Sequence, residues 1–249
     1  METIDVLGVQ IRCLDQAGLI DQAIIWSSSP GVHTITYANA HTLNQACQDA
    51  SYRDLLSTVD LIYADGVSLM WSSRLFGGCR LIKLTGADWI DPLAARAAST
   101  GVSLYLLGGR PNIARRAAQR LLSRHASLVI AGVADGYFLE KSVSEVADEI
   151  SALRPGLVLV GMGCPAQEYW IAQHFSVLEN GVWWGVGALL DYLAGAEKRA
   201  PRWFDRLGLE WLWRLAQDPS GKWRRYILGN PIFVYRIMRQ YLNHRHRLR

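Results

Sequence analysis

The stretch "LIYADGVSLMW", residues 61–71, joins a predicted strand to a predicted helix. It opens with three large apolar side chains in a row, a pattern typical of a buried strand. Asp65 and Gly66 then interrupt the apolar residues, and a helical spacing of apolar residues begins at Val67. A carboxylate at the end of a buried strand predicts a ligand-facing turn. The alternative is that Asp65 only caps the helix from Val67.

Apolar runs of the same kind recur along the chain, and each is followed by a helical pattern. The predicted strands are residues 33–38, 61–64, 102–109, 127–133, 156–163 and 181–187. Strands of near-continuous apolar character that alternate with helices indicate an α/β fold, with a mostly parallel, Rossmann-like sheet and helices on both faces. In such sheets ligands collect at the carboxyl ends of the strands.

Small and polar residues follow the predicted strands and would lie together along one rim. They are Asn39, Asp65, Gly66, Gly108, Gly109, Asp135, Gly136, Tyr137, Gly161, Gly163 and residues 185–187. Glycines let a ligand approach the backbone, and helix N-termini favour anions. For any single glycine the alternative is a tight strand-to-helix turn without a ligand. Together the six turns predict a ligand-binding rim.

Charge divides the chain into a predicted α/β body, residues 1–196, and a basic helical appendage, residues 197–249. From Lys198 onward there are 13 basic and 3 acidic side chains, a net charge of +10, whereas residues 1–197 carry a net charge of −6. The acidic N-terminus does not resemble a signal peptide. No apolar run approaches the ~20 residues that cross a bilayer. We expect a protein that is soluble or lies on a membrane surface.

The four cysteines, Cys13, Cys47, Cys79 and Cys164, are far apart and form no C-x-x-C pair. This spacing argues against a zinc site or a disulfide framework and favours a reducing compartment.

The segment "GMGCPA", residues 161–166, fits the dinucleotide-binding pattern G-x-G-x-x-A. That pattern needs an acidic residue at the end of the next strand, but the next predicted strand ends in "WWGVG". Pro165 also removes an amide from the helix start. A nicotinamide-dependent oxidoreductase is therefore the weaker reading, and a non-catalytic membrane-associated scaffold is a second rival.

Several motifs occur together and in one order. They are "ADG" (64–66), "TGADW" (85–89), "LLGG" (106–109), "DGYF" (135–138), "GMGCPAQE" (161–168), "GVGALLDYLAG" (185–195), "RAPRW" (199–203) and "GLEWLWRL" (208–215). From about residue 4 to about residue 226 the chain resembles the WecG/TagA/CpsF family of bacterial glycosyltransferases. The resemblance implies an inverting, metal-independent transfer from a UDP-sugar to a polyprenyl-diphosphate-linked saccharide. It also implies a peripheral protein at the cytoplasmic face of the inner membrane.

The resemblance assigns the catalytic base to Asp65, which would take the proton from the acceptor hydroxyl. The diphosphate of a departing UDP needs positive charge. The chain has no Asp-x-Asp motif to hold a metal, so no metal or other cofactor is expected. The candidate cations are Lys83, Arg214, Arg224 and Arg225. Family members more often carry an arginine at the position of Lys83.

The same resemblance assigns the uracil contacts to Tyr137 and Asp191, and the donor sugar and phosphates to Asn39 and Gln167. The alternatives are that Tyr137 is a core residue and that Asn39 and Gln167 are helix caps. Glu168 is expected to have a structural role.

Two positions depart from the family pattern. Gly221 stands where members commonly carry a basic residue, and the adjacent Lys222 is a candidate replacement. Tyr37 stands where threonine is common. The donor sugar, N-acetylmannosamine, glucose or a uronic acid, therefore stays open.

The end of the chain predicts an amphipathic helix from Pro231. Val234, Ile237, Met238 and Tyr241 form an apolar stripe, with Arg236, Arg239 and Asn243 on the opposite face. Such a helix suits an anionic membrane surface, and Arg225, Arg236 and Arg239 are the predicted membrane or acceptor contacts. Packing against a second copy of the chain is the alternative. The small-ligand rim argues against nucleic acid.

Overall fold

The structure is a computed structural model that describes residues 2–201, 204 and 208–247. The last residues of the "RAPRW" motif, 202–203, lie outside the described residues. The strands are β1 (Thr3–Val6), β2 (Val9–Arg12), β3 (Gly31–Ala38), β4 (Leu61–Ala64), β5 (Ser103–Gly108), β6 (Val129–Ala134), β7 (Leu157–Gly161) and β8 (Asn180–Gly185). The helices of the body are α1 (Gln16–Ser27), α2 (Ala40–Gln48), α3 (Ala50–Ser57), α4 (Val67–Phe76), α5 (Gly86–Thr100), α6 (Ile113–Arg124), α7 (Val143–Leu153), α8 (Ala166–Gln173), η1 (Phe175–Val177) and α9 (Leu189–Ala194). The C-terminal helices are α11 (Glu210–Gln217), α12 (Pro219–Trp223), η2 (Arg224–Leu228) and α13 (Gly229–Arg247).

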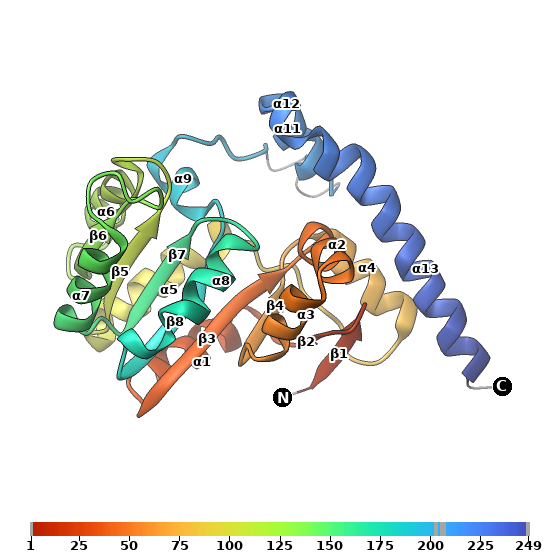
Figure 1. Ribbon diagram of the computed structural model, residues 1–249, viewed down its shortest axis with the longest axis horizontal. Coiled ribbons are helices and arrows are strands. Elements are labelled where there is room, and N and C mark those ends of the chain that lie inside the picture. The colour runs from red at the N-terminus through yellow and green to blue at the C-terminus, as the bar shows by residue number, and fades with distance from the viewer. Residues whose placement is uncertain (1, 202–203, 205–207, 248–249) are drawn as a thin grey trace.

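Six strands form one parallel sheet in the order β4-β3-β8-β7-β5-β6 (Figure 1). The chain runs from β3 to one edge of the sheet and from β5 to the other edge. Connections that leave in opposite directions open a crevice at the carboxyl ends of the strands. The predicted α/β fold class is confirmed, and each of the six predicted strands is present.

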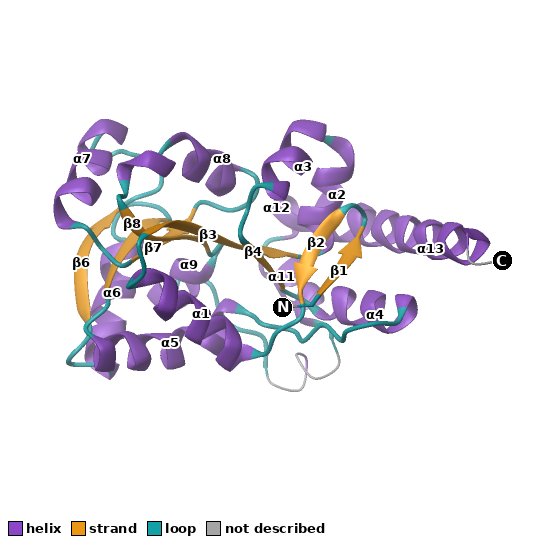
Figure 2. Cartoon of the chain, turned by 90° about the horizontal axis from the view of Figure 1, so that it is seen from below, coloured by secondary structure: helices purple, strands orange, loops and turns teal. Residues whose placement is uncertain are grey.

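Both faces of the sheet are buried, which explains why its strands are apolar without a polar alternation. Successive side chains of β5 point to opposite faces, so that Leu104 and Leu106 join one core while Tyr105 and Leu107 join another. Helices α1, α5, α6 and α9 cover the first face, and α7 and α8 cover the second (Figure 2).

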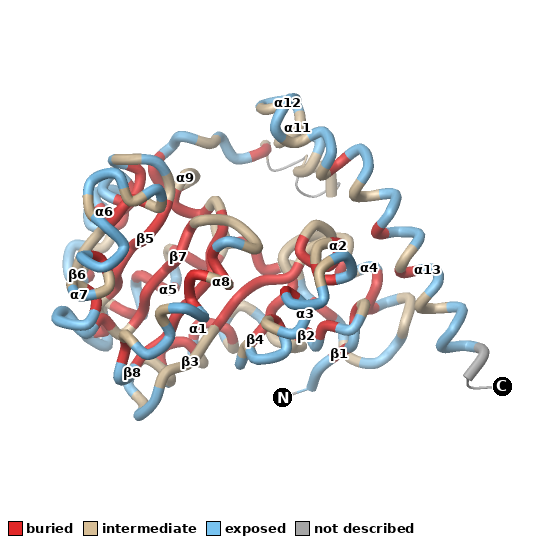
Figure 3. The backbone as a smooth tube through the Cα atoms, in the orientation of Figure 1, coloured by how far each residue is buried: buried red, intermediate tan, exposed pale blue. Residues whose placement is uncertain are grey.

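A third core lies beside β4 and is closed by the C-terminal helix. It combines the antiparallel hairpin β1–β2, which the sequence pattern did not predict, with α2, α3 and the inner side of α13. Phe233 and Ile237 of α13 are buried there, whereas the outer side of the helix is exposed (Figure 3). The Asn44 side chain donates a hydrogen bond of 2.7 Å to the Gly229 carbonyl. The C-terminal helix is thus docked on the body.

The predicted start of the tail helix at Pro231 is wrong. Helix α12, the π-helical turn η2 and α13 follow one another without a break from Pro219, so Pro231 lies in the first turn of α13. Proline has no backbone N–H, so the continuous helix lacks one hydrogen-bond donor at this position, directly after the π-helical turn. Among the described residues, no helix is apolar over a length sufficient to cross a bilayer.

The expectation of unpaired cysteines is also wrong for two of the four. Cys13, just after β2, and Cys79, after α4, form a disulfide although 66 residues separate them. The fold brings their Cα atoms to 6.1 Å, within the range that a disulfide spans. Sequence spacing alone could not show this proximity. Cys47 and Cys164 are free.

Leu106 gives a test of the buried sheet. Its side chain is fully buried on β5. We expect Leu106→Ala to lower the free energy of unfolding by about 2–5 kcal/mol, because the change leaves a cavity. Urea unfolding followed by circular dichroism measures the loss. Leu122→Ala on α6, where the side chain is 38% exposed, is the control and should cost less than about 1 kcal/mol. Equal losses for the two variants would contradict this assignment of the core.

Candidate active site

Asp65 lies at the turn between β4 and α4, with its carboxylate directed away from its own helix. Gly66 is the N-cap residue of α4, and no side chain caps the first turn. Gly66 has a φ of 112° and a ψ of 153°, a conformation that is essentially restricted to glycine. The alternative that Asp65 caps the helix is therefore wrong. Its carboxylate Oδ2 lies 3.5 Å from the Asn39 amide nitrogen Nδ2.

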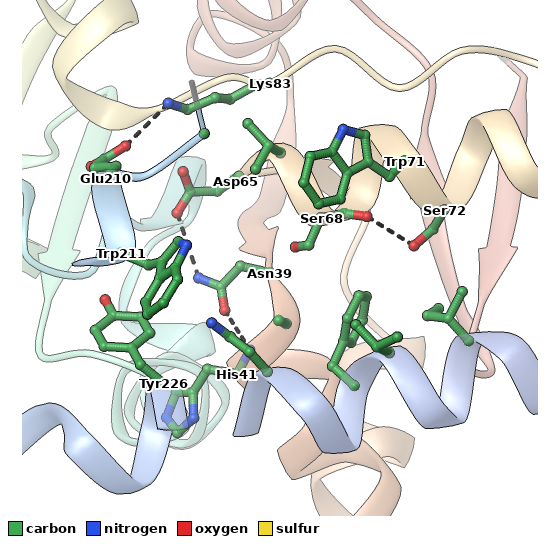
Figure 4. Close-up of a pocket in the computed structure, with 18 of the residues that line it drawn as sticks. Asn39, His41, Asp65, Ser68, Trp71, Ser72, Lys83, Glu210, Trp211 and Tyr226 are labelled. Atoms are coloured by element: carbon green, nitrogen blue, oxygen red, sulfur yellow. Dashed lines mark hydrogen bonds and ion pairs between the residues drawn. The ribbon is translucent and has the colours of Figure 1, made fainter. Parts of the chain in front are cut away.

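Asn39, at the carboxyl end of β3, caps a helix and faces Asp65 at the same time. Its Oδ1 accepts hydrogen bonds from the backbone amides of His41 at 3.0 Å and Thr42 at 3.1 Å. The capping alternative therefore holds for Asn39, and its contact with the donor stays a prediction. The same two bonds fix the plane of the amide, so that Nδ2 is turned to Asp65 (Figure 4).

The C-terminal helix α11 brings a carboxylate and an arginine over this turn. Glu210 Oε2 lies 3.1 Å from Lys83 Nζ, and Glu210 Oε1 lies 2.7 Å from Arg214 Nη2. The Arg214 guanidinium also lies over the Tyr192 ring, 5.0 Å from its centroid, at a cation–π distance. Glu210 therefore joins one cation of the body to one cation of the tail, next to Asp65.

These charges set the protonation of Asp65. Burial raises the pKa of Asp65 above its ordinary value, while the nearby Arg214 and Lys83 hold the rise back. A carboxylate with a raised pKa is a better proton acceptor than an exposed aspartate. The site thus suits a general base.

Two cavities meet at this cluster. The polar cavity has a volume of about 150 Å³ and lies over the ends of β3, β4, β7 and β8. The apolar cavity has a volume of about 570 Å³ and lies between α4, α11 and α13 (Figure 4). Both are lined by the same six residues, Asn39, His41, Asp65, Glu210, Arg214 and Arg225. Asp65 therefore lies at the junction of the two cavities.

The predicted tail arginines divide into two groups. Arg214 and Arg225 line both cavities, whereas Arg224 is exposed and lies over the Trp223 ring. The expectation that Arg224 belongs to the catalytic group is not met by this geometry, because η2 turns the side chain outward. The candidate replacement Lys222 pairs with Glu197 at 2.8 Å and lines neither cavity.

The predicted outward face of the tail helix also needs correction. Arg236 Nη1 donates to the Asn44 backbone carbonyl at 3.1 Å and to its Oδ1 at 2.7 Å, so Arg236 docks the helix rather than contacting a membrane. Ile237 of the predicted stripe is buried against the body, and Val234 and Met238 line the apolar cavity. Arg239 is exposed, as expected for a surface contact.

Gln167 lies beneath the rim rather than in a cavity. It is fully buried, its Nε2 donates to Glu168 Oε1 at 2.7 Å, and its Oε1 accepts from the Gly187 amide at 2.9 Å. Glu168 in turn accepts hydrogen bonds from Thr36 at 2.7 Å and from Tyr52 at 3.2 Å. This buried network ties α8 to β3 and to the turn after β8. The structure therefore gives Gln167 a supporting position, not the predicted direct contact with a donor.

The predicted uracil residues lie toward the opposite edge of the sheet. Tyr137, after β6, is 62% exposed, so the alternative that it is a core residue is wrong. Asp191 lies on α9, and neither residue lines the two cavities. Strands lie about 4.8 Å apart, so the ends of β4 and β6 are separated by roughly 24 Å along the rim. A ligand that contacts both Asp65 and Tyr137 would extend along most of the rim.

The predicted glycines of the rim serve two purposes. Gly66 and Gly163 line cavities. Gly108, by contrast, packs so closely on the next turn that a Cβ atom would lie 2.4 Å from the Gly161 carbonyl oxygen. The remaining three, Gly109, Gly136 and Gly161, are also crowded, by Ile113, by the Gly108 backbone and by the Gly187 carbonyl oxygen respectively. Here the tight-turn alternative holds.

Sequence reasoning missed several residues of the site, among them His41, Trp71, Glu210 and Trp211. Glu210 had a usable signal, because it stands four residues before Arg214 on a predicted helix, the spacing of an ion pair. His41, Trp71 and Trp211 had none, since only the folded chain brings α2, α4 and α11 together. Among the described residues, no three His, Cys, Asp or Glu side chains are grouped to hold a metal ion.

Comparison with known proteins gives two findings. A family model described as "Glycosyl transferase WecG/TagA/CpsF family" matches residues 4–247. The chain is also 32% identical, over 205 residues, to the N-acetylglucosaminyldiphosphoundecaprenol N-acetyl-beta-D-mannosaminyltransferase of Bacillus spizizenii. That alignment covers 82% of this chain and 78% of the relative.

The charges of Lys83 and Glu210 predict that removing each of them shifts the pKa of Asp65 in opposite directions. Lys83→Met removes a positive charge that favours the Asp65 carboxylate, so the pKa of Asp65 should rise. Glu210→Gln removes a negative charge that disfavours it, so the pKa of Asp65 should fall. A pH titration of the Asp65 side-chain carboxyl carbon by NMR measures both shifts. Lys141→Met, which breaks a pair with Glu149 elsewhere, is the control. Shifts of the same sign in the two variants would contradict the proposed geometry.

Proposed function

The chain belongs to the WecG/TagA/CpsF family of glycosyl transferases, and we propose that it moves a sugar from a UDP-sugar to a polyprenyl-diphosphate-linked saccharide. In this proposal the transfer inverts the anomeric carbon and needs no metal ion. The observation that carries the proposal is the position of Asp65. Its carboxylate lies at the junction of two cavities, with cations held beside it by Glu210.

Asp65 acts as the general base. It takes the proton of the acceptor hydroxyl while the hydroxyl oxygen forms a bond to the anomeric carbon of the donor. The bond between that carbon and the diphosphate oxygen breaks at the same time, and UDP leaves with the electron pair. The raised pKa of Asp65 supports this role, because a proton acceptor works best when its pKa is near the working pH.

Arg214 and Lys83 stabilise the departing diphosphate. Both cations lower the pKa of Asp65 through their charge. Both are partly buried, with side-chain exposures of 20% for Arg214 and 14% for Lys83. Charges held in a partly dry site interact more strongly than charges in water. Tyr137 and Asp191 remain the proposed contacts of the uracil, at the far end of the rim.

The relative supplies a specific acceptor for the proposal. Its name states that it uses N-acetylglucosaminyldiphosphoundecaprenol and transfers N-acetylmannosamine. We propose an acceptor of this class for the present chain, in the synthesis of a cell-surface polysaccharide. The donor is left among N-acetylmannosaminyl, glucosyl and uronosyl groups, because Tyr37 lines the polar cavity at a position where the family pattern differs.

A panel experiment tests this function. The protein is incubated with each UDP-sugar and a short-chain polyprenyl-diphosphate-linked N-acetylglucosamine, and the product is weighed by mass spectrometry. One donor should add the mass of one N-acetylhexosamine, hexose or hexuronic acid residue without an added metal and in the presence of EDTA. Titration of UDP and NADH against tryptophan fluorescence tests the oxidoreductase alternative. Binding of NADH but not UDP, with no sugar transferred by any donor, would refute the proposal.

Asp65→Asn is the direct test of the base. We expect turnover to fall by about 10²–10⁴-fold, because the amide cannot accept the proton. The fold should remain intact, since Asp65 does not cap α4. Circular dichroism checks the fold, and Asp54→Asn on the exposed side of α3 is the control. Turnover by Asp65→Asn within threefold of the parent would exclude a general-base role.

We propose a peripheral position on the cytoplasmic face of the inner membrane, and the outer side of the C-terminal helices supports contact with a membrane surface. Leu228, Ile232 and Leu242 are 49%, 40% and 51% exposed, next to basic side chains of the same segment. Exposed apolar side chains among cations suit an anionic bilayer surface.

A vesicle experiment tests this surface. The parent protein should sediment with phosphatidylglycerol vesicles and less with phosphatidylcholine vesicles, because each basic side chain near an anionic surface contributes roughly 1 kcal/mol. The double variant Leu228→Ser/Ile232→Ser should bind at least tenfold more weakly. Leu139→Ser, 73% exposed on the body, is the control. Equal binding by the double variant and the control would show that this side does not contact the membrane.

A further inference from the structure

The hydroxyl of Tyr37 is a buried polar group beside the polar cavity and has no hydrogen-bond partner in the protein. Tyr37 is the last residue but one of β3, is 8% exposed and lines this cavity. No hydrogen bond between described residues includes its hydroxyl, although buried polar side chains nearly always have a partner. An unpartnered hydroxyl at the wall of a polar cavity indicates that a ligand supplies the partner.

The polar groups around this hydroxyl are bonded to other partners. Glu168 accepts hydrogen bonds from three other side chains. The Gly187 amide donates to Gln167 Oε1 at 2.9 Å. Burial raises the pKa of the Tyr37 hydroxyl well above its ordinary value, so the hydroxyl keeps its proton near neutral pH. Tyr37 therefore offers a hydrogen-bond donor to an oxygen of a ligand.

The Tyr37 ring is held rigidly in place. It belongs to the core on the first face of the sheet, and its centroid lies 6.5 Å from that of the Tyr63 ring. The hydroxyl packs so closely on the turn after β8 that a Cβ atom at position 187, which is a glycine, would lie 2.5 Å from it. Side chains in a densely packed core cannot move aside without opening a void. The ring is thus a fixed wall of the polar cavity.

Tyr37 lies below the part of the rim where the donor sugar belongs. Strand β3 pairs with β4 on one side and with β8 on the other, and the Asp65 amide donates to the Ala38 carbonyl at 2.8 Å. In the proposed function the donor extends from Asp65 toward Tyr137. Its sugar is the end next to Asp65, because the acceptor hydroxyl attacks the anomeric carbon while the base takes the proton. The sugar therefore lies over the ends of β3 and β8, beside Tyr37.

The room for this sugar is small. The polar cavity has a volume of about 150 Å³, whereas small-molecule sites usually have about 300–1,000 Å³. Threonine, which is common at position 37 in the family, has no ring and would leave more space. An N-acetylhexosamine is larger than a hexose by an acetyl group. A rigid wall discriminates against the larger of two such ligands, because overpacking is unfavourable.

We infer that Tyr37 selects the donor sugar, with its ring excluding sugars that carry an N-acetyl group and its hydroxyl donating to an oxygen of a hexose or hexuronic acid. The inference rests on the proposed function and narrows its donor class. Of the donor groups that the proposed function leaves open, the glucosyl and uronosyl groups remain. The Bacillus relative, by its name, transfers an N-acetylmannosaminyl group, so the two proteins would differ in their donors.

The parent protein gives the first test. UDP, UDP-glucose, UDP-glucuronic acid, UDP-N-acetylglucosamine and UDP-N-acetylmannosamine are each titrated against tryptophan fluorescence, which needs no acceptor. UDP-glucose or UDP-glucuronic acid should bind about tenfold or more tightly than either N-acetylated donor. Sugar transfer to the short-chain acceptor should follow the same order. Equal or tighter binding of an N-acetylated donor would overturn the inference.

Two substitutions separate the ring of Tyr37 from its hydroxyl. Tyr37→Thr removes the ring, so the affinity for N-acetylated donors should rise about tenfold relative to the preferred donor. Tyr37→Phe keeps the ring and should still discriminate against N-acetylated donors. It should weaken the preferred donor about fivefold and change the UDP affinity less than about twofold, because one hydrogen bond to the sugar is lost.

Tyr105→Phe is the matched control. Tyr105 is also buried, but its hydroxyl donates to Glu149 at 3.0 Å in another core, so its loss should leave the donor preference unchanged. Circular dichroism checks the fold of each variant. Tyr37→Phe preserves the packing of the ring, so its binding data and those of the parent decide the question if Tyr37→Thr does not fold.

The outcomes separate donor selection from the proposed function. A folded Tyr37→Thr variant with the parent's preference, or a Tyr37→Phe variant that loses UDP as strongly as the preferred donor, would overturn selection by Tyr37 and leave the transferase. A protein that binds neither UDP nor any UDP-sugar, and transfers none of them, would refute the transferase and the selection together.

Discussion

The ion pairs of Glu210 are the interaction on which the site depends. Lys83 belongs to the body and Arg214 to the tail, and Glu210 pairs with both at 3.1 Å and 2.7 Å. Removing two cations from water costs several kcal/mol for each unless a partner compensates. Glu210 supplies that partner, so the cations stay beside Asp65 in the absence of substrate. Arg225 lines the same two cavities and lies outside these ion pairs.

Much of the fold could be predicted from the sequence, because strands buried on both faces must be continuously apolar and strand ends must carry small or polar residues. The position of Asp65 followed from this rule. The hairpin β1–β2 and the Cys13–Cys79 disulfide could not be predicted, since each depends on tertiary contacts rather than on local pattern. Of the adjacent candidates Arg224 and Arg225, only Arg225 lines the cavities, and Arg224 is exposed. Both lie at the start of the π-helical turn η2, and no sequence signal marked this turn.

The apolar stripe of the tail helix shows a different kind of error. The spacing of Val234, Ile237 and Met238 was correctly read as one face of a helix, but the face was assigned to a membrane. In the structure the body competes for the same side chains, and it covers Ile237 while leaving Val234 and Met238 at the cavity. An amphipathic pattern indicates that the apolar face of a helix is buried, but it does not identify the surface that buries it. The exposed stripe on the outer side is shorter and begins earlier, at Leu228.

The contact between α13 and the N-terminal hairpin has a consequence for how the protein matures. Gln240 Nε2 donates to Asp5 Oδ1 at 2.9 Å, and the Leu7 amide donates to Gln240 Oε1 at 2.9 Å, a link across 233 residues. Chains emerge from the ribosome N-terminus first. Part of the apolar side of the hairpin thus stays exposed to solvent until the last helix has been synthesised. Because Glu210, Arg214 and Arg225 arrive with that same segment, closure of the core and completion of the charge cluster coincide. A nascent or prematurely ended chain lacks these three groups and therefore has an incomplete site.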